Sequence, residues 1–162
     1  MLGDDLVKSK VPALRQMLDV HDRYDASVIA VEEVLPELTS RYGVVKAKNY
    51  SNPCLVEGLV EKPAPGTAPS NLAILGRYVI KPEIFPILHQ TPFGKNNELQ
   101  ITDGLNTLCK QSNVFALKLE GKWYTVGDKT EYLKTVLAFA VNRPELGDFD
   151  SFLKKLVESE LK

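Results

Sequence analysis

Short apolar runs rich in β-branched residues constrain the fold of this chain more than any other feature of its sequence. They occupy residues 26–34, 43–48, 55–61 and 72–80. Runs of this length and composition, bounded by turn-forming residues, predict buried β-strands. The close spacing of these runs predicts a mixed sheet rather than a purely parallel one.

Segments with helical periodicity separate and follow these runs. The predicted helices lie within residues 12–21, 82–88, 101–109, 128–141 and 144–162. Their apolar side chains recur at three- and four-residue spacing, and the last helix is amphipathic. Asp128 is the expected N-cap of the fourth helix, and Thr102 or Asp103 that of the third. The mixture of strands and helices predicts one domain of the α/β or α+β class.

Composition and charge exclude several classes of partner. The chain has 162 residues, of which 20 are basic and 21 acidic, so its formal net charge is −1. A protein that binds duplex nucleic acid needs a clustered basic face, and no such cluster occurs in the sequence. No apolar run approaches the ~20 residues of a membrane span, and the N-terminal residues do not resemble a signal peptide. We therefore expect a cytoplasmic protein with no nucleic-acid and no membrane partner.

The cysteines give little chemistry. Cys54 and Cys109 are the only two, and neither lies in a C-x-x-C spacing typical of zinc sites. Two cysteines do not make a disulfide framework. We expect two unpaired thiols in a reducing compartment.

The acid–base pair Glu61-Lys62 is the sharpest chemical pattern, at the end of a predicted strand and directly before Pro63. Successive strand residues point to opposite faces, but this rule relaxes at a strand end because Pro63 forces the chain to turn. A carboxylate accepts hydrogen bonds from sugar hydroxyls, and an ammonium neutralises phosphate charge, so the pair can hold a sugar phosphate. The alternative is a pair of solvent-exposed charges at a sheet edge.

Two other positions invite a functional interpretation. Gly43 begins a predicted strand, where the lack of a side chain lets a ligand approach the backbone closely, although a lone glycine is more often part of a turn. Asp4, at the expected end of a strand that begins before it, could hold Mg²⁺ together with substrate phosphates. The alternative is that Asp4 and Asp5 are turn and cap residues.

Several motifs together resemble those of bacterial UTP–glucose-1-phosphate uridylyltransferases (UDP-glucose pyrophosphorylases). They are Tyr-Gly-Val-Val at 42–45, Val-Glu-Lys-Pro at 60–63, Ala-Pro-Ser-Asn-Leu-Ala-Ile at 68–74 and Asn-Glu-Leu-Gln-Ile-Thr-Asp at 97–103. The resemblance implies an α/β fold with a mixed, mainly Rossmann-like sheet flanked by helices. It also implies that residues 1–162 are a single partial nucleotidyltransferase domain, the C-terminal part, which ends in an amphipathic helix at 144–162.

The resemblance implies a role for each candidate residue. Gly43 and Glu61 would contact the sugar, Lys62 would bind the sugar phosphate and act in catalysis, and Asp4 would hold the catalytic Mg²⁺. Thr125 stands where the family has an Asp, a candidate second metal ligand. A neutral hydroxyl is a poorer Mg²⁺ ligand than a carboxylate, so we expect weaker metal binding unless Asp128 compensates.

The implied activity of the parent protein is formation of UDP-glucose and pyrophosphate from UTP and glucose 1-phosphate, in a homo-oligomer. The Gly-rich nucleotide loop of the family has no equivalent in this chain, so the isolated chain is expected to be inactive. Two alternatives stay open. One is a related enzyme, such as a thymidylyltransferase, and the other is a non-catalytic module for oligomerisation or sugar-phosphate binding.

Overall fold

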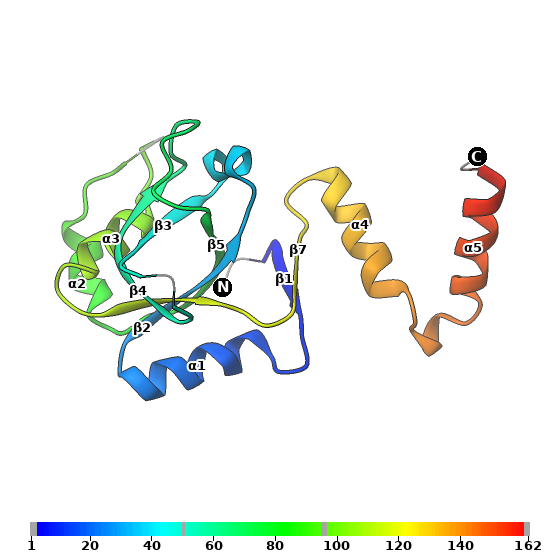
Figure 1. Cartoon of the computed structure of the whole chain (residues 1–162), viewed down its shortest axis with the longest axis horizontal. Helices are drawn as coiled ribbons and strands as arrows, with labels where there is room; N and C mark the ends of the chain where they lie inside the picture. The colour runs from blue at the N-terminus through cyan, green and yellow to red at the C-terminus, as the bar shows by residue number, and fades with distance from the viewer. Residues whose placement is uncertain (1–2, 50, 95–96, 161–162) are drawn as a thin grey trace. The chain divides into compact units, whose positions relative to one another are not determined.

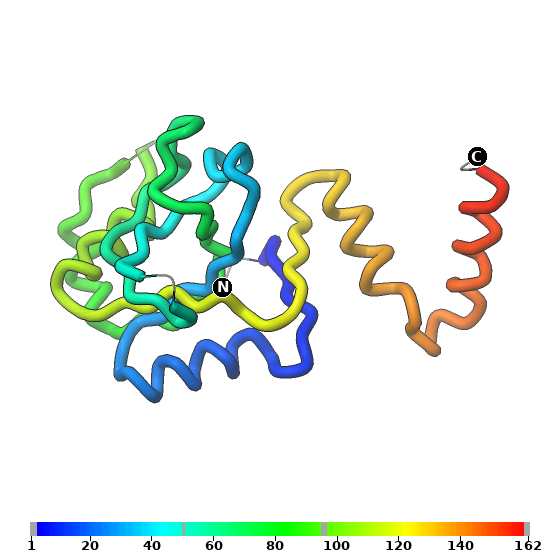
Figure 2. Tube along the Cα trace, viewed as in Figure 1, coloured from blue at the N-terminus to red at the C-terminus, as the bar shows by residue number. Residues whose placement is uncertain are grey.

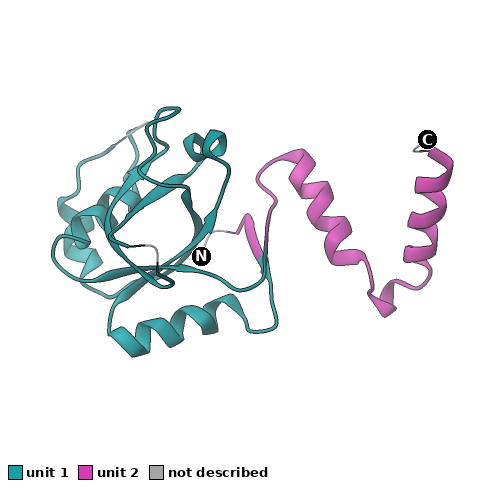
Figure 3. Ribbon diagram, viewed as in Figure 1, with its two compact units in different colours: residues 1–2, 7–122 teal, residues 3–6, 123–162 magenta. Residues whose placement is uncertain are grey.

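The computed structural model describes residues 3–49, 51–94 and 97–160 (Figure 1). Strands and helices are interspersed along the chain, which confirms the predicted mixed α/β class. The described chain divides into two compact units, one of residues 7–122 and the other of residues 3–6 and 123–162 (Figure 3).

Five strands of the first unit form a closed barrel in the order β2-β5-β3-β4-β6. Their bounds are Ser27–Glu33 for β2, Gly43–Ala47 for β3, Cys54–Glu61 for β4, Leu72–Val79 for β5 and Val114–Lys118 for β6. β2 pairs with β6 in parallel, and the other described pairings of the barrel are antiparallel. The sheet is therefore mixed, as predicted. Its closure was not predicted, and it depends on β6, which pairs with both β2 and β4.

The helices of the first unit pack around these strands. α1 (Ala13–Tyr24) contacts β2 and β5, α2 (Ile84–Gln90) packs against α3 (Ile101–Leu108), and α3 contacts β4. The buried core includes Ile29, Val45, Leu59 and Leu105, which come from the strands and from α3. Burial of these side chains stabilises the packing of α3 on β4. A short 3₁₀ helix, η1 (Pro36–Arg41), leads the chain from β2 back to the start of β3.

The two predicted helix caps have different outcomes. Asp128 caps α4 as predicted, since its Oδ1 accepts a hydrogen bond from Glu131 N at 2.9 Å. The cap predicted at Thr102 or Asp103 is wrong, because α3 begins at Ile101 after Gln100, which makes no side-chain cap bond. Thr102 lies inside the first turn of α3, and its hydroxyl donates to a side chain of β4.

The second unit is followed most easily along the chain trace (Figure 2). Its short sheet consists of β1 (Asp5–Lys8) and β7 (Lys122–Thr125). Of these two strands, Val7, Lys8 and Lys122 belong to the first unit. The helices α4 (Lys129–Ala140), η3 (Pro144–Leu146) and α5 (Phe149–Glu160) follow. The strand predicted to end near Asp4 would lie in residues 1–2, outside the described residues, and Gly3 and Asp4 form a turn that leads into β1. In the described part of the chain, no helix has the length and hydropathy to cross a bilayer.

Candidate functional site

Gly43 and Glu61 face each other across the β3–β4 ladder, at the end where β3 begins and β4 ends. A Cβ atom on Gly43 would lie 3.0 Å from Glu61 Oε2 and 3.1 Å from Ile74 Cδ1. Both distances are tighter than ordinary van der Waals contact. The absence of a side chain at position 43 therefore makes room for the Glu61 carboxylate.

Lys62 directly follows β4, and the backbone turns at this residue. Its φ of 44° lies in the left-handed region, which non-glycine residues seldom adopt, and its N–H donates to Tyr42 O at 3.0 Å. Lys62 Nζ lies 3.9 Å from Glu61 Oε1, and the side chains of Lys62 and Glu61 are 52% and 23% exposed. The carboxylate and the ammonium thus converge on one accessible space, although they are neighbours in sequence.

Thr102 completes this cluster from α3. Its Oγ1 donates to Glu61 Oε2 at 2.7 Å, and the residue is only 4% exposed. The sequence contains this residue in the 97–103 motif, but its interpretation as a possible helix cap misses the contact with Glu61. The missing information is the packing of α3 on β4, which joins residues 41 positions apart.

In the second unit, the structure brings Asp4 and Thr125 together. The main-chain oxygen of Asp4 accepts hydrogen bonds from Val126 N at 2.8 Å and from Thr125 Oγ1 at 3.3 Å. A Cβ atom on Gly127 would lie 3.5 Å from Thr125 Oγ1 and 3.6 Å from Asp4 Oδ2. Thr125, the position at which the resemblance implies an Asp, is therefore close to the predicted metal ligand.

Asp5 and Asp128 have other partners. Asp5 accepts a hydrogen bond from Trp123 Nε1 at 2.7 Å, which joins β1 to β7. Asp128 is the N-cap of α4, so its carboxylate is already bonded to the backbone. The described residues contain no group of three or more His, Cys, Asp or Glu side chains able to hold a metal ion. Among the described residues, Asp4 is therefore not part of a cluster of three or more such side chains.

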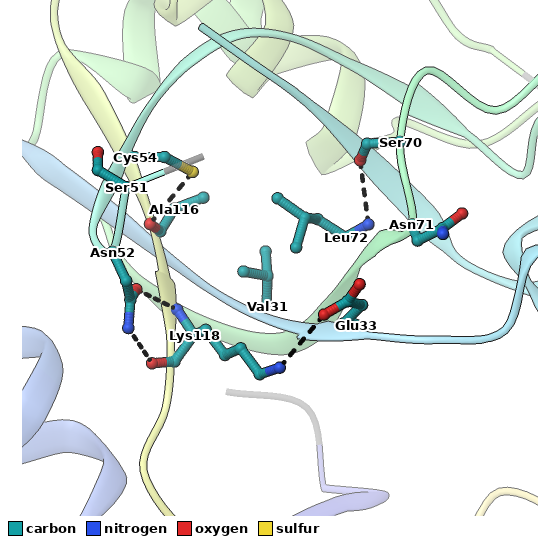
Figure 4. Close-up of a pocket in the computed structure, with 10 residues that line it drawn as sticks. All are labelled: Val31, Glu33, Ser51, Asn52, Cys54, Ser70, Asn71, Leu72, Ala116 and Lys118. Atoms are coloured by element: carbon teal, nitrogen blue, oxygen red, sulfur yellow. Dashed lines mark hydrogen bonds and ion pairs between the residues drawn. The ribbon is translucent and has the colours of Figure 1, made fainter. Parts of the chain in front are cut away.

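A separate pocket of about 350 Å³ lies at one end of the barrel (Figure 4). It is lined by Val31, Glu33, Ser51, Asn52, Cys54, Ser70, Asn71, Leu72, Ala116 and Lys118, none of them a predicted site residue. Lys118 Nζ lies 3.5 Å from a carboxylate oxygen of each of Glu32 and Glu33, so its charge is already balanced. Burial raises the pKa of the Cys54 thiol, which keeps it protonated near neutral pH. The Lys118 ammonium thus lies near two carboxylates, whereas the Lys62 ammonium lies 3.9 Å from that of Glu61.

The chain is similar to several known proteins. The nucleotidyl transferase family matches residues 1–140. The UTP–glucose-1-phosphate uridylyltransferase of Staphylococcus epidermidis is 45% identical over 159 residues, which cover 96% of this chain and 55% of that protein. The Bacillus subtilis enzyme of the same name is 42% identical over an alignment of 166 positions, which covers 99% of this chain and 56% of that protein.

A solved structure is similar over much of the chain. It is a UDP-glucose pyrophosphorylase complexed with UDP-glucose, with a TM-score of 0.84 and 40% identity. The match covers 88% of this chain and 56% of that one. This chain thus spans about half the length of the relatives it matches. On the match over residues 1–140, the chain belongs to the nucleotidyl transferase family.

Proposed function

We propose that the protein containing this chain transfers a uridylyl group from UTP to glucose 1-phosphate, forming UDP-glucose and pyrophosphate. Relatives that carry this activity in their names are 39–45% identical to the chain. The observation that carries the proposal is the convergence of Glu61 and Lys62, 3.9 Å apart, at a strand end beside a side-chain-free Gly43. Such a site offers acceptors for hydroxyl groups and a cation for a phosphate in one place.

In this proposal, Gly43 and Glu61 bind the glucosyl group, and Lys62 binds the phosphate of glucose 1-phosphate. An oxygen of that phosphate attacks the α-phosphorus of UTP, and the bond from the α-phosphorus to the pyrophosphate leaving group breaks. Transfers of this kind depend on positioning and charge neutralisation more than on acid–base chemistry. Lys62 is therefore the proposed catalytic residue of this chain, since it holds the nucleophile and offsets its charge.

Asp4 is the proposed ligand of Mg²⁺, which, when bound, would neutralise charge on the reacting phosphates. Thr125 contributes a hydroxyl beside Asp4 where the resemblance implies a carboxylate. We therefore propose that this site binds Mg²⁺ more weakly than one with two carboxylates would.

We also propose that the protein self-associates through the helices of the second unit. The exposed large apolar side chains of α4 are Tyr132, Leu133, Val136 and Leu137, and those of α5 are Phe152, Leu156 and Val157. Apolar side chains that gather on helix surfaces are typical of protein–protein contacts. The free thiols of Cys54 and Cys109 support placement in a reducing compartment such as the cytoplasm.

The test of the activity is pyrophosphate release by the whole protein in which this chain occurs, with glucose 1-phosphate and either UTP or dTTP. Faster release with UTP is the expected result. Faster release with dTTP would favour a thymidylyltransferase instead. Binding of glucose 1-phosphate without release from either nucleotide would favour a non-catalytic sugar-phosphate module.

A further inference from the structure

The two carboxylate oxygens of Glu61 have different surroundings. Oε2 accepts the hydrogen bond from Thr102 Oγ1 at 2.7 Å and is also the atom nearest to the vacant Cβ position of Gly43. Oε1 lies 3.9 Å from Lys62 Nζ, which is beyond hydrogen-bond distance. One oxygen is therefore bonded to the protein, while the other lies beside the ammonium without a direct hydrogen bond to it.

Thr102 is held in place by the way α3 packs on β4. Thr102 and Asn106 are four residues apart, so they lie on one face of the helix, and Leu59 and Glu61 are two residues apart in the strand. Asn106 Oδ1 accepts a hydrogen bond from Leu59 N at 3.1 Å, and Thr102 donates to the Glu61 side chain. Two side chains of one helical face thus fix the last residues of β4.

We propose that Thr102 is a positioning residue that fixes the Glu61 carboxylate for recognition of the sugar hydroxyls, an inference that rests on the proposed function of Glu61. A glutamate side chain loses considerable rotational freedom when it is fixed, and here the buried hydroxyl fixes it before the sugar arrives. A carboxylate distinguishes the configuration of a hydroxyl group only when its own direction is fixed.

The hydrogen bond from Thr102 to Glu61 also keeps Glu61 and Lys62 available to bind the sugar phosphate. Without the Thr102 hydroxyl, the Glu61 side chain is free to turn and close the 3.9 Å gap to Lys62 Nζ. In a closed ion pair, the Glu61 carboxylate would be less available to accept hydrogen bonds from the sugar, and the Lys62 ammonium less available to bind the phosphate. Loss of Thr102 Oγ1 should therefore weaken binding of both parts of glucose 1-phosphate.

The test compares variants of the whole protein in binding and in turnover. Thr102→Val keeps the shape of the side chain and removes the hydroxyl, whereas Thr102→Ser keeps the hydroxyl. We expect Thr102→Val to raise the dissociation constant of glucose 1-phosphate roughly tenfold, as expected for loss of a hydrogen bond to a charged group, and Thr102→Ser to restore most of the affinity. Thr102→Val should also reduce discrimination against galactose 1-phosphate and mannose 1-phosphate.

Thr39→Val is the matched control, because Thr39 is 1% exposed and its Oγ1 donates to Pro36 O at 2.7 Å. It removes a buried hydroxyl whose hydrogen bond has the same length as that of Thr102, 2.7 Å. It should leave the ratio of affinities for the three sugar phosphates unchanged. A change in that ratio equal to the change in Thr102→Val would show a general effect of a lost buried hydroxyl and would overturn the inference.

Glu61→Ala separates this inference from the proposed function. If Glu61→Ala leaves the affinity for glucose 1-phosphate unchanged, the proposed function of this strand end is wrong. If Glu61→Ala weakens the affinity, the effect of Thr102→Val should disappear in the double variant, since the carboxylate to be positioned is gone. Equal effects of Thr102→Val in the presence and absence of Glu61 would leave the proposed function intact and overturn the positioning role.

Discussion

The carboxylate of Glu61 occupies the space that a side chain at Gly43 would need. The two residues are partners in the β3–β4 ladder, and Oε2 lies 3.0 Å from the position of a Cβ atom at residue 43. Even the smallest side chain there would press on the carboxylate or on Ile74. The geometry of the acid therefore depends on a residue of the neighbouring strand.

Gly43→Ala is expected to displace the Glu61 carboxylate and to lower affinity for glucose 1-phosphate by about ten- to hundredfold, the usual effect of a misplaced binding group. Isothermal titration of the whole protein with glucose 1-phosphate measures this. Gly104→Ala is the control, because its added methyl group would meet Leu88 of α2 rather than Glu61. Equal losses in the two variants would indicate a general packing defect.

Glu61→Ala and Lys62→Ala are each expected to raise KM for glucose 1-phosphate by ten- to hundredfold. Loss of one charge-assisted hydrogen bond costs about 1.5–3 kcal/mol, which corresponds to this range. KM for UTP should change little. Lys46→Ala is the matched control, since Lys46 also lies 3.6 Å from a carboxylate, that of Glu57, but is not in the cluster. A loss of UTP affinity with glucose 1-phosphate binding preserved would contradict the assignment.

Thr125→Asp is expected to strengthen Mg²⁺ binding, because it adds a carboxylate beside Asp4. We expect the half-saturating Mg²⁺ concentration to fall roughly tenfold, the effect of one added charge-assisted contact. A titration of activity or of bound Mn²⁺ measures the change. Thr125→Asn has a similar shape without the charge and should show no gain. An unchanged Mg²⁺ requirement in Thr125→Asp would argue against a metal at Asp4.

The two thiols should react slowly in the folded protein. Burial raises the pKa of Cys109 from its ordinary value of 9.0 to about 11, and burial also raises that of Cys54. Little thiolate is then present at pH 8, so labelling by a thiol-specific disulfide reagent should be slow until denaturant is added. Rapid labelling of both thiols under native conditions would contradict this burial.

The raised pKa of Cys109 also predicts how the stability of the protein changes with pH. The folded protein keeps the Cys109 proton to higher pH than the unfolded chain does, so between pH 9 and about 11 the unfolded chain loses this proton first. The free energy of unfolding should therefore fall as pH rises through that window. Urea titrations at several pH values should show a smaller decline in Cys109→Ala than in the parent protein.

Leu133→Asp is expected to weaken self-association, because Leu133 is 62% exposed on α4 and a charge opposes burial in an apolar contact. Sedimentation velocity over a range of concentrations measures the change. Leu133→Ala removes the apolar side chain without adding a charge and should weaken self-association less than Leu133→Asp does. A parent protein that remains monomeric at the highest concentration would rule out the proposed contact.

Local patterns in the sequence predict much of this fold. The β-branched runs place β2 to β5 within a few residues of their observed bounds, because strand propensity and burial act over short segments. Pro63 correctly indicates a turn at the end of β4, and Lys62 adopts the left-handed backbone conformation there. The convergence of Glu61 and Lys62 follows from this local feature.

Features that depend on distant contacts were not predictable in the same way. β1 and β7 are four residues each, too short for a clear pattern, and the Asp5–Trp123 hydrogen bond joins residues 118 positions apart. Thr102 lies at a sequence position typical of a helix cap. Only the packing of α3 on β4 shows that its hydroxyl donates a hydrogen bond to Glu61. Closure of the barrel likewise depends on where β6 lies, which local propensity does not determine.

The pairing of β1 with β7 has a consequence for the order of assembly during synthesis. Asp4 is synthesised before the partners of its main-chain oxygen, Thr125 and Val126, which follow more than a hundred residues later. Contacts of such sequence separation form late, after the local helices and hairpins. The surroundings of the proposed metal ligand are therefore completed only after residue 126 has been added, and a chain released before that point would carry Asp4 without them.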